Sequence, residues 1–131
     1  MKTFQLDIIT PISIQSYENI SYLRIPSIDG LTGIKSKHAD AIIALDVGEI
    51  KITIGGKDKY FATSGGFSDI KPEGVQLLLE TIEPSKNINK KRAENSLKRA
   101  QENIHNKSMN LDRAQRAIQR AKNRLKLLSR D

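Results

Sequence analysis

The first 84 residues place apolar and polar side chains in short alternating runs. The strand-like runs occupy residues 4–8, 23–25, 50–54, 60–63, 67–70 and 75–82. The run at 23–25 stops before Pro26, and we interpret Gly55-Gly56 and Gly65-Gly66 as hairpin turns. A period of two, interrupted by Gly and Pro, indicates antiparallel strands. Many short strands without helices between them predict an antiparallel β-sandwich.

A different period begins after residue 85. The apolar positions there recur every three or four residues: Ala93, Leu97, Ala100 and Ile104, then Leu111, Ala114, Ile118, Ala121, Leu125 and Leu128. This average period of 3.5 is typical of helices packed side by side, so we expect an antiparallel two-helix hairpin. Asn89 is the expected N-cap of the first helix and Asn110 or Ser108 that of the second, with residues 105–108 joining them.

Composition changes at the same point and predicts two domains, a β-sandwich at 1–84 and a helical hairpin at 85–131. All 8 Gly and all 4 Pro precede residue 85. Residues 1–84 hold 8 Lys/Arg and 11 Asp/Glu, a net charge of −3, whereas residues 85–131 hold 14 and 4, a net charge of +10. Such asymmetry suggests that the hairpin meets an acidic partner.

The hairpin is expected to be weakly anchored. Short helices are marginal alone in water and depend on packing. Fully burying four Leu or Ile side chains contributes roughly 6–12 kcal/mol, against an ordering cost of about 1–2 kcal/mol per backbone residue. The two helices therefore need a supporting surface, and a few kcal/mol would decide between alternative surfaces.

A basic stripe follows the apolar positions of the second helix. Its members are Arg113, Arg116, Arg120 and Arg124. A solvated helix face is the ordinary interpretation, but such faces interleave Glu with Lys or Arg, and this helix offers only Asp112. The alternative is a stripe that pairs with acidic groups of a partner.

The candidate chemistry of an enzyme is sparse. The chain has no Cys, and its two His residues, His38 and His105, lie in different segments without metal-ligand spacing. No phosphate-binding glycine motif occurs. We therefore expect neither catalysis nor a metal. We also expect no signal peptide or spanning helix, and hence a protein that is soluble or peripheral to a membrane through partners.

Five motifs, in order, resemble ATP synthase epsilon subunits. They are Leu6-Asp7-Ile8-Ile9-Thr10-Pro11, Asp29-Gly30-Leu31-Thr32-Gly33-Ile34 with His38, Ser64-Gly65-Gly66-Phe67, Ile88-Asn89-Lys90-Lys91-Arg92-Ala93 and Arg120-Ala121-Lys122-Asn123-Arg124-Leu125. Together they extend over nearly the whole chain. The family's architecture is the one that the periodicities predict.

The resemblance implies a setting and partners. In such proteins the sandwich belongs to the rotor of the central stalk, where it binds the gamma subunit and sits on the c-ring. The complex is an F-type ATPase that carries out ATP synthesis and ion transport, with this subunit peripheral, on the cytoplasmic face of the cell inner membrane. The loop nearest to the gamma subunit and the c-ring would contain Asp29, Gly30, Leu31, Thr32, Gly33 and His38.

The resemblance also implies inhibition of ATP hydrolysis. The family's hairpin can leave the sandwich, extend along gamma into the catalytic alpha/beta head and block rotation. Extended from residue 88 to 128, this hairpin would span roughly 60 Å. The arginine stripe would then pair with acidic segments of the head.

Some bacterial members bind ATP on the folded hairpin. Ile88, Arg92, Ala93, Arg120 and Arg124 match their motif, but Asn89 replaces its aspartate. ATP is therefore expected only as a weak regulatory ligand, and no other cofactor is expected. A second departure is Lys35-Ser36-Lys37, where the family usually has Pro-Gly or Pro-Asn.

The alternative function is a basic nucleic-acid-binding module on a β-sandwich scaffold. A helical segment of net charge +10 would attract phosphates. Against this, residues 85–131 contain no Phe, Tyr or Trp to stack on bases. We therefore expect protein partners rather than nucleic acid.

Overall fold

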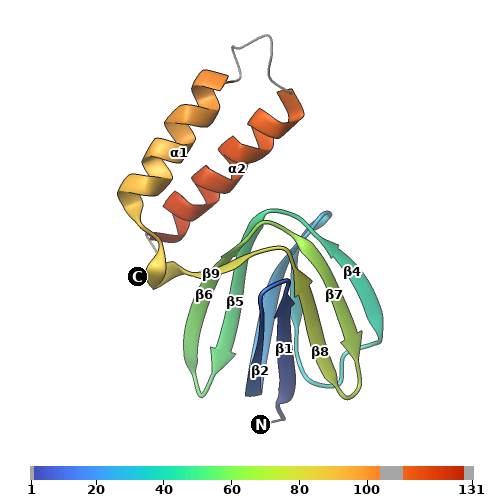
Figure 1. Ribbon diagram of the computed structural model, residues 1–131. Helices are drawn as coiled ribbons and strands as arrows, with labels where there is room; N and C mark the ends of the chain where they lie inside the picture. Colours follow the sequence, from blue (N-terminus) through green and yellow to red (C-terminus); the bar gives the residue numbers. More distant parts are fainter. Residues whose placement is uncertain (1, 104–110, 129–131) are drawn as a thin grey trace.

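The computed structural model describes residues 2–103 and 111–128 (Figure 1). Its elements are β1 (Phe4–Thr10), β2 (Ser13–Ser27), β3 (Gly30–Ile34), β4 (Ala41–Leu45), β5 (Gly48–Ile54), β6 (Lys57–Thr63), β7 (Gly66–Lys71), β8 (Gly74–Leu79), β9 (Ile82–Pro84), the 3₁₀ turn η1 (Ser85–Asn87), α1 (Lys90–Asn103) and α2 (Leu111–Leu128). The strands wrap into two layers, and the helices form a hairpin at one end of them. The predicted β-sandwich and helical hairpin are confirmed.

The long strand β2 belongs to both layers. Neighbouring strands pair in the order β1-β8-β7-β4-β2-β5-β6-β9. In addition, β1 and β3 each pair with β2. The N-terminal half of β2 pairs with β1, and its C-terminal half runs between β3 and β5. Pairing is antiparallel except between β1 and β8, which are parallel. This arrangement closes both layers around one core.

The predicted period-two alternation coincides with burial. Leu6 and Ile8 of β1 and Ile50 and Ile52 of β5 are fully buried, whereas the residues between them lie toward the outside. The core also takes Phe4, Ile20, Leu23, Ile25, Ile34, Leu45, Phe61, Ile70, Val75, Leu77 and Leu79.

Three strand predictions need correction. First, β2 does not stop before Pro26 but continues through it to Ser27. Second, β3 and β4 were not anticipated, because two glycines and a short apolar run hide their alternation. Third, the run at 75–82 is two strands: β8 pairs with β1 and β7, whereas β9 pairs with β6 in the other layer. The chain changes layer at Glu80 and Thr81.

The two double-glycine segments differ. Gly55 and Gly56, at φ 56° and 76°, form the predicted hairpin turn between β5 and β6. The prediction for Gly65-Gly66 was wrong, because β6 and β7 do not pair with each other and these glycines carry the chain between layers. Gly66 has φ 151°, and a Cβ there would clash with the Leu78 carbonyl oxygen.

The helices meet through their alanines. Ala93, Ala100, Ala114 and Ala121 are buried, as the seam predicts. Leu127, which was not among the predicted positions, is fully buried, whereas Leu125 and Leu128 are only partly buried. The predicted seam residue Ile104, the linker 105–108, the caps Ser108 and Asn110, and the side chain of Leu111 lie outside the described residues.

Asn89 caps the first helix as predicted. Its side-chain Oδ1 accepts from the Arg92 N–H at 3.0 Å, and its carbonyl oxygen accepts from the Ala93 N–H at 3.0 Å.

Neither α1 nor α2, in the extent described, is long and apolar enough to cross a membrane.

Candidate functional site

The C-terminal half of α2 lies against β5, β6 and η1. Leu127 is the centre of this contact and is 0% exposed. It shares a buried cluster with Ala62 of β6, Ile88 and Ala93, and with partly buried Tyr60 at the rim. Because this cluster is small and separate from the sandwich core, the hairpin is attached through a limited apolar contact.

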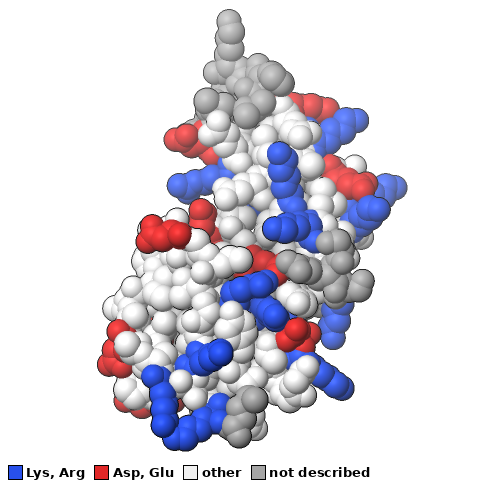
Figure 2. Space-filling view, turned by 180° about the vertical axis from the view of Figure 1, so that it is seen from behind, with Lys and Arg blue, Asp and Glu red and all other residues white. Residues whose placement is uncertain are grey.

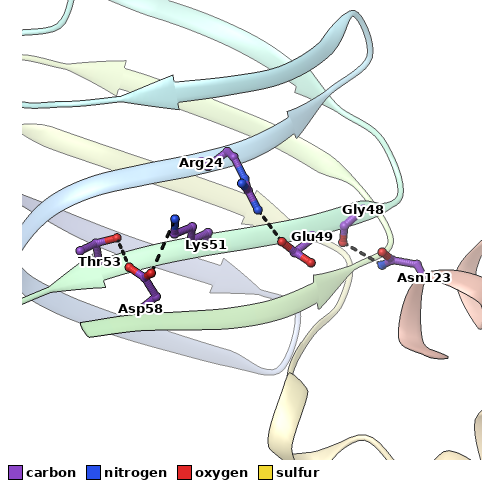
Figure 3. A network of polar contacts seen from close by, with 7 residues as sticks. All are labelled: Arg24, Gly48, Glu49, Lys51, Thr53, Asp58 and Asn123. Atoms are coloured by element: carbon purple, nitrogen blue, oxygen red, sulfur yellow. Dashed lines mark hydrogen bonds and ion pairs between the residues drawn. The ribbon is translucent and has the colours of Figure 1, made fainter. Parts of the chain in front are cut away.

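Two polar contacts fix the orientation of the hairpin. Asn123 Nδ2 donates to the Gly48 carbonyl oxygen at 2.8 Å, at the point where β5 begins (Figure 3). Arg124 Nη2 donates to Glu83 Oε1 at 3.0 Å, and its Nε lies 3.0 Å from Glu83 Oε2. Both residues are about a quarter to a third exposed, so water weakens this ion pair only in part.

These contacts give one residue of the basic stripe a partner within the chain. Arg124 has an acidic partner on its own sandwich, which the sequence pattern did not reveal because Glu83 is 41 residues away. Arg113, Arg116 and Arg120 are exposed on the helix surface. Lys and Arg side chains project around the hairpin, while a broad area of the sandwich carries no charge (Figure 2).

The structure divides the predicted ATP residues into two groups. Arg120 and Arg124 line a cavity of about 470 Å³ between the helices and β9, together with Ser96 and Arg99. Ile88 and Ala93 are instead buried in the apolar cluster, and Asn89 caps α1. Arg92 is exposed and does not line this cavity.

Arg99 is a site residue that sequence reasoning missed. It follows Arg92 by seven residues, which is two helical turns, so the spacing placed both on one side of α1. The cavity therefore gathers Arg99, Arg120 and Arg124 around Glu83. An excess of guanidinium groups in one hollow suits an anionic ligand.

The residues predicted to contact gamma and the c-ring do not form one loop. Gly30 to Gly33 belong to strand β3, and the Asp29 N–H donates to Ser27 Oγ in the turn before it. A Cβ on Gly33 would lie 2.5 Å from the Tyr22 hydroxyl oxygen, so the Tyr22 side chain would have to shift to admit one.

His38 lies between β3 and β4, and its ring contacts the start of β1. Its ring packs edge-on against Phe4, with 5.7 Å between the centroids. Its Nδ1 is buried and has no hydrogen-bond partner among the described residues.

An apolar row on the outer face of the sandwich was not predicted. Cross-strand register aligns Ile14, Ile9, Leu78, Phe67 and Ala44 on neighbouring strands β2, β1, β8, β7 and β4. Ile14, Phe67 and Leu78 are 72%, 57% and 43% exposed. Ile42, two residues before Ala44 on β4, is 77% exposed. Such a continuous apolar face marks an interaction surface. Its sequence signal is the run Leu77-Leu78-Leu79, where alternation fails because both faces are apolar.

A polar network along β5 has a structural character. Thr53 Oγ1 donates to Asp58 Oδ1 at 2.6 Å, and Lys51 Nζ lies 3.6 Å from Asp58 Oδ2 (Figure 3). The hydrogen bond from Thr53, followed by the charge of Lys51, lowers the pKa of Asp58. On the same strand, Glu49 pairs with Arg24. Within the described residues, no group of three acidic or His side chains is arranged to hold a metal.

Two family models match the chain in sequence. Residues 3–85 match the ATP synthase delta/epsilon chain beta-sandwich domain, and residues 86–129 match the ATP synthase delta/epsilon chain long alpha-helix domain. A chain of the mitochondrial ATP synthase of Euglena gracilis has the same fold, with a TM-score of 0.86 at 16% identity over 96% of this chain and 81% of that one.

Full-length relatives agree with this match. The ATP synthase epsilon chain of Desulforamulus reducens is 36% identical over 95% of this chain and 96% of its own length. That of Staphylococcus saprophyticus is 32% identical over 97% of both. The chain therefore belongs to the ATP synthase delta/epsilon chain family.

Proposed function

We propose that this protein is the epsilon subunit of an F-type ATP synthase, a non-catalytic part of the central stalk that joins the catalytic head to the c-ring and restrains ATP hydrolysis. Family membership over both domains supports the subunit assignment. The subunit is peripheral, at the cytoplasmic face of the cell inner membrane, in a complex that translocates protons or sodium ions.

The gamma subunit binds the apolar row on the sandwich. The row presents exposed apolar side chains at Ile14, Leu78 and Phe67. Contact of these side chains with water is unfavourable, so their burial against a partner is favoured. Burial of such a row against a neighbouring subunit would hold the sandwich on the rotor. The segment from Asp29 to His38 supplies further contacts toward gamma and the c-ring.

The hairpin restrains hydrolysis by leaving the sandwich. Among the described residues, its docked state includes a small apolar cluster, the Asn123–Gly48 hydrogen bond and the Arg124–Glu83 ion pair. We expect a contact of this kind to leave only a modest free-energy difference between docked and extended states. Arg113, Arg116 and Arg120 are exposed on the surface of the docked hairpin, and on extension they pair with acidic groups of the head. Arg124 exchanges Glu83 for such a partner on extension.

Deletion of residues 85–131 tests this function. The assembled complex should keep the sandwich and gain hydrolytic turnover. Neutralising Arg113, Arg116, Arg120 and Arg124 together with Gln should leave assembly intact and also relieve inhibition. A triple variant that keeps Arg124 separates the stripe from the Glu83 pair. Unchanged hydrolysis in both the deletion and the quadruple variant would refute an inhibitory hairpin.

A regulatory nucleotide is a second proposal, favoured by the cavity of about 470 Å³ lined by Arg99, Arg120 and Arg124. Arg99 and Arg120 offer charge-assisted hydrogen bonds to phosphate oxygens, whereas Arg124 is paired with Glu83 in the same cavity. Asn89 lacks the charge of the family's aspartate, so the affinity for ATP is expected to be weak. Calorimetric titration with ATP should give heat that Arg99→Gln diminishes and the exposed control Lys91→Gln preserves. Absence of heat at millimolar ATP would exclude the site.

A further inference from the structure

Strand β3 has one unpaired edge. Among the described strands it pairs with β2 alone. Ser27 of β2 pairs with Gly30 of β3 and also with Leu45 of β4, so β3 and β4 lie on opposite edges of β2. The outer edge of β3 therefore has no strand beside it in the described part of the chain.

The pairing register shows which backbone groups face outward. The Pro26 carbonyl oxygen accepts from the Asp46 N–H at 2.9 Å and thus points toward β4, away from β3. Pro26 opposes Leu31, so this is a pair without mutual hydrogen bonds, and the same holds two residues on for Arg24 and Gly33. The N–H and C=O groups of Leu31 and Gly33 consequently point outward from β3.

This edge lacks the usual protection against pairing. Exposed edge strands ordinarily carry charged residues, Pro or a bulge. The five residues of β3 are Gly-Leu-Thr-Gly-Ile and carry no charge. Leu31 is 66% exposed and Ile28, in the preceding turn, is 64% exposed. An edge with free hydrogen-bonding groups and apolar flanks is suited to accept another strand.

The surroundings indicate the charge of that strand. Leu31 lines a hollow of about 390 Å³ between the sandwich and α2. Its positively charged lining residues are Arg24, Lys122 and Lys126, and its negatively charged lining residue is Glu49. A side chain that enters this hollow from a strand beside β3 meets a net positive charge.

We infer that the outer edge of β3 binds an extended segment of a rotor subunit by β-strand addition, with an acidic side chain of that segment directed into the hollow below α2. This inference rests on the proposed function and specifies how the sandwich is recognised. It also places the added strand beside the docked hairpin, so binding there and docking of α2 influence each other.

Hydrogen exchange measured by NMR tests the inference directly, with the full chain alone and in complex with its gamma subunit. In the free chain the Thr32 amide, which points toward β2, should exchange slowly, and the Leu31 and Gly33 amides should exchange fast. In the complex both outer amides should slow by about tenfold or more. A complex in which they stay fast would overturn the inference and leave the proposed function standing. Failure to form any complex would overturn both.

A matched pair of variants gives a second test. Leu31→Pro removes an outward N–H without touching a bond to β2, so the fold should persist, as circular dichroism can verify. It should weaken gamma binding by at least about threefold relative to Leu31→Ala, which keeps the N–H. Equal binding by the two variants would overturn the inference. Slow exchange of the outer amides in a concentration-dependent dimer of the free chain would do the same, because the occupant would be a second copy.

Discussion

Arg124 of α2 and Glu83 of β9 form an ion pair across the joint between hairpin and sandwich, with two nitrogen–oxygen distances of 3.0 Å. Glu83 lies two residues before η1, where the chain leaves the sandwich, so the pair ties the end of the hairpin to its beginning. The contact joins a residue of the basic stripe to the domain from which the hairpin must separate. Its loss should favour the extended state.

Breaking this pair should loosen the hairpin modestly. Glu83→Gln or Arg124→Gln should cost about 0.5–1 kcal/mol of docking free energy, because both side chains keep contact with water. That corresponds to roughly a two- to fivefold shift toward undocked molecules. Distances between spin labels on exposed positions of hairpin and sandwich would measure the populations.

A control variant and a double-mutant cycle make this test more specific. Lys90 and Glu94 form an exposed pair within α1 at 4.0 Å, so Glu94→Gln should leave docking unchanged. The double variant should be no worse than either single variant, since each removes the same interaction. Additive effects would show that Arg124 and Glu83 act separately.

Leu127→Ala should undock the hairpin far more strongly. Truncation of a fully buried Leu costs about 2–5 kcal/mol, and Leu127 is the central side chain of the small interface cluster. Leu125→Ala, at a partly buried position of the same helix, should cost less. Amide exchange in α2 and urea unfolding of the sandwich would separate the two domains. A Leu127→Ala chain with a fully protected α2 would contradict this account of docking.

Gly66→Ala should destabilise the sandwich. The added Cβ would clash with the backbone carbonyl of Leu78, and φ of 151° is strained for a residue with a side chain. Gly55→Ala is the matched control, because φ is also positive (56°) but the surrounding space is open. Its cost should be about 1–2 kcal/mol. Urea denaturation should rank Gly66→Ala as clearly more destabilising, and equal midpoints would disprove the steric argument.

Thr53→Val should raise the pKa of Asp58. The hydrogen bond from Thr53 is the largest cause that lowers this pKa, and the Lys51 charge is a smaller one. A lowered folded pKa stabilises the fold above the unfolded value of about 3.9 and loses that effect as the pH falls through the folded pKa. Thr53→Val should therefore reduce the pH dependence of stability in this acidic window.

The carboxyl carbon shift of Asp58, followed by NMR across acidic pH, would measure the change in pKa. Lys51→Met should raise the pKa less than Thr53→Val does. The reverse ranking would assign the lowered pKa to charge rather than to the hydrogen bond.

Local pattern and tertiary structure contributed different parts of this result. Alternation located the buried strands, as at Leu6 and Ile8, because side chains on a strand point to opposite faces at every step. The same rule failed at β3, where Gly30 and Gly33 have no side chain to reveal a face. It also misassigned Gly65-Gly66, since turn residues do not tell which strands the turn connects.

The candidate site shows the same division. Asn89 was identified as a cap because capping acts over three residues, and its bond to the Arg92 N–H confirms it. The bond from Asn123 to Gly48 spans 75 residues, and nothing in either local segment announces it. Leu127 was missed because it falls outside the three- and four-residue spacing of the seam, although the seam residues Leu125 and Leu128 pack against the same buried cluster.

The sequence by itself determined the two domains, the helical period, the charge asymmetry and the family motifs, all of which depend on neighbours within a few residues. Only the tertiary structure decided that Arg124 pairs with Glu83, that Leu127 anchors the hairpin, that an apolar row crosses five strands and that β3 keeps a free edge. These features arise where distant segments meet, and such meetings are set by the packing of the whole chain around its core.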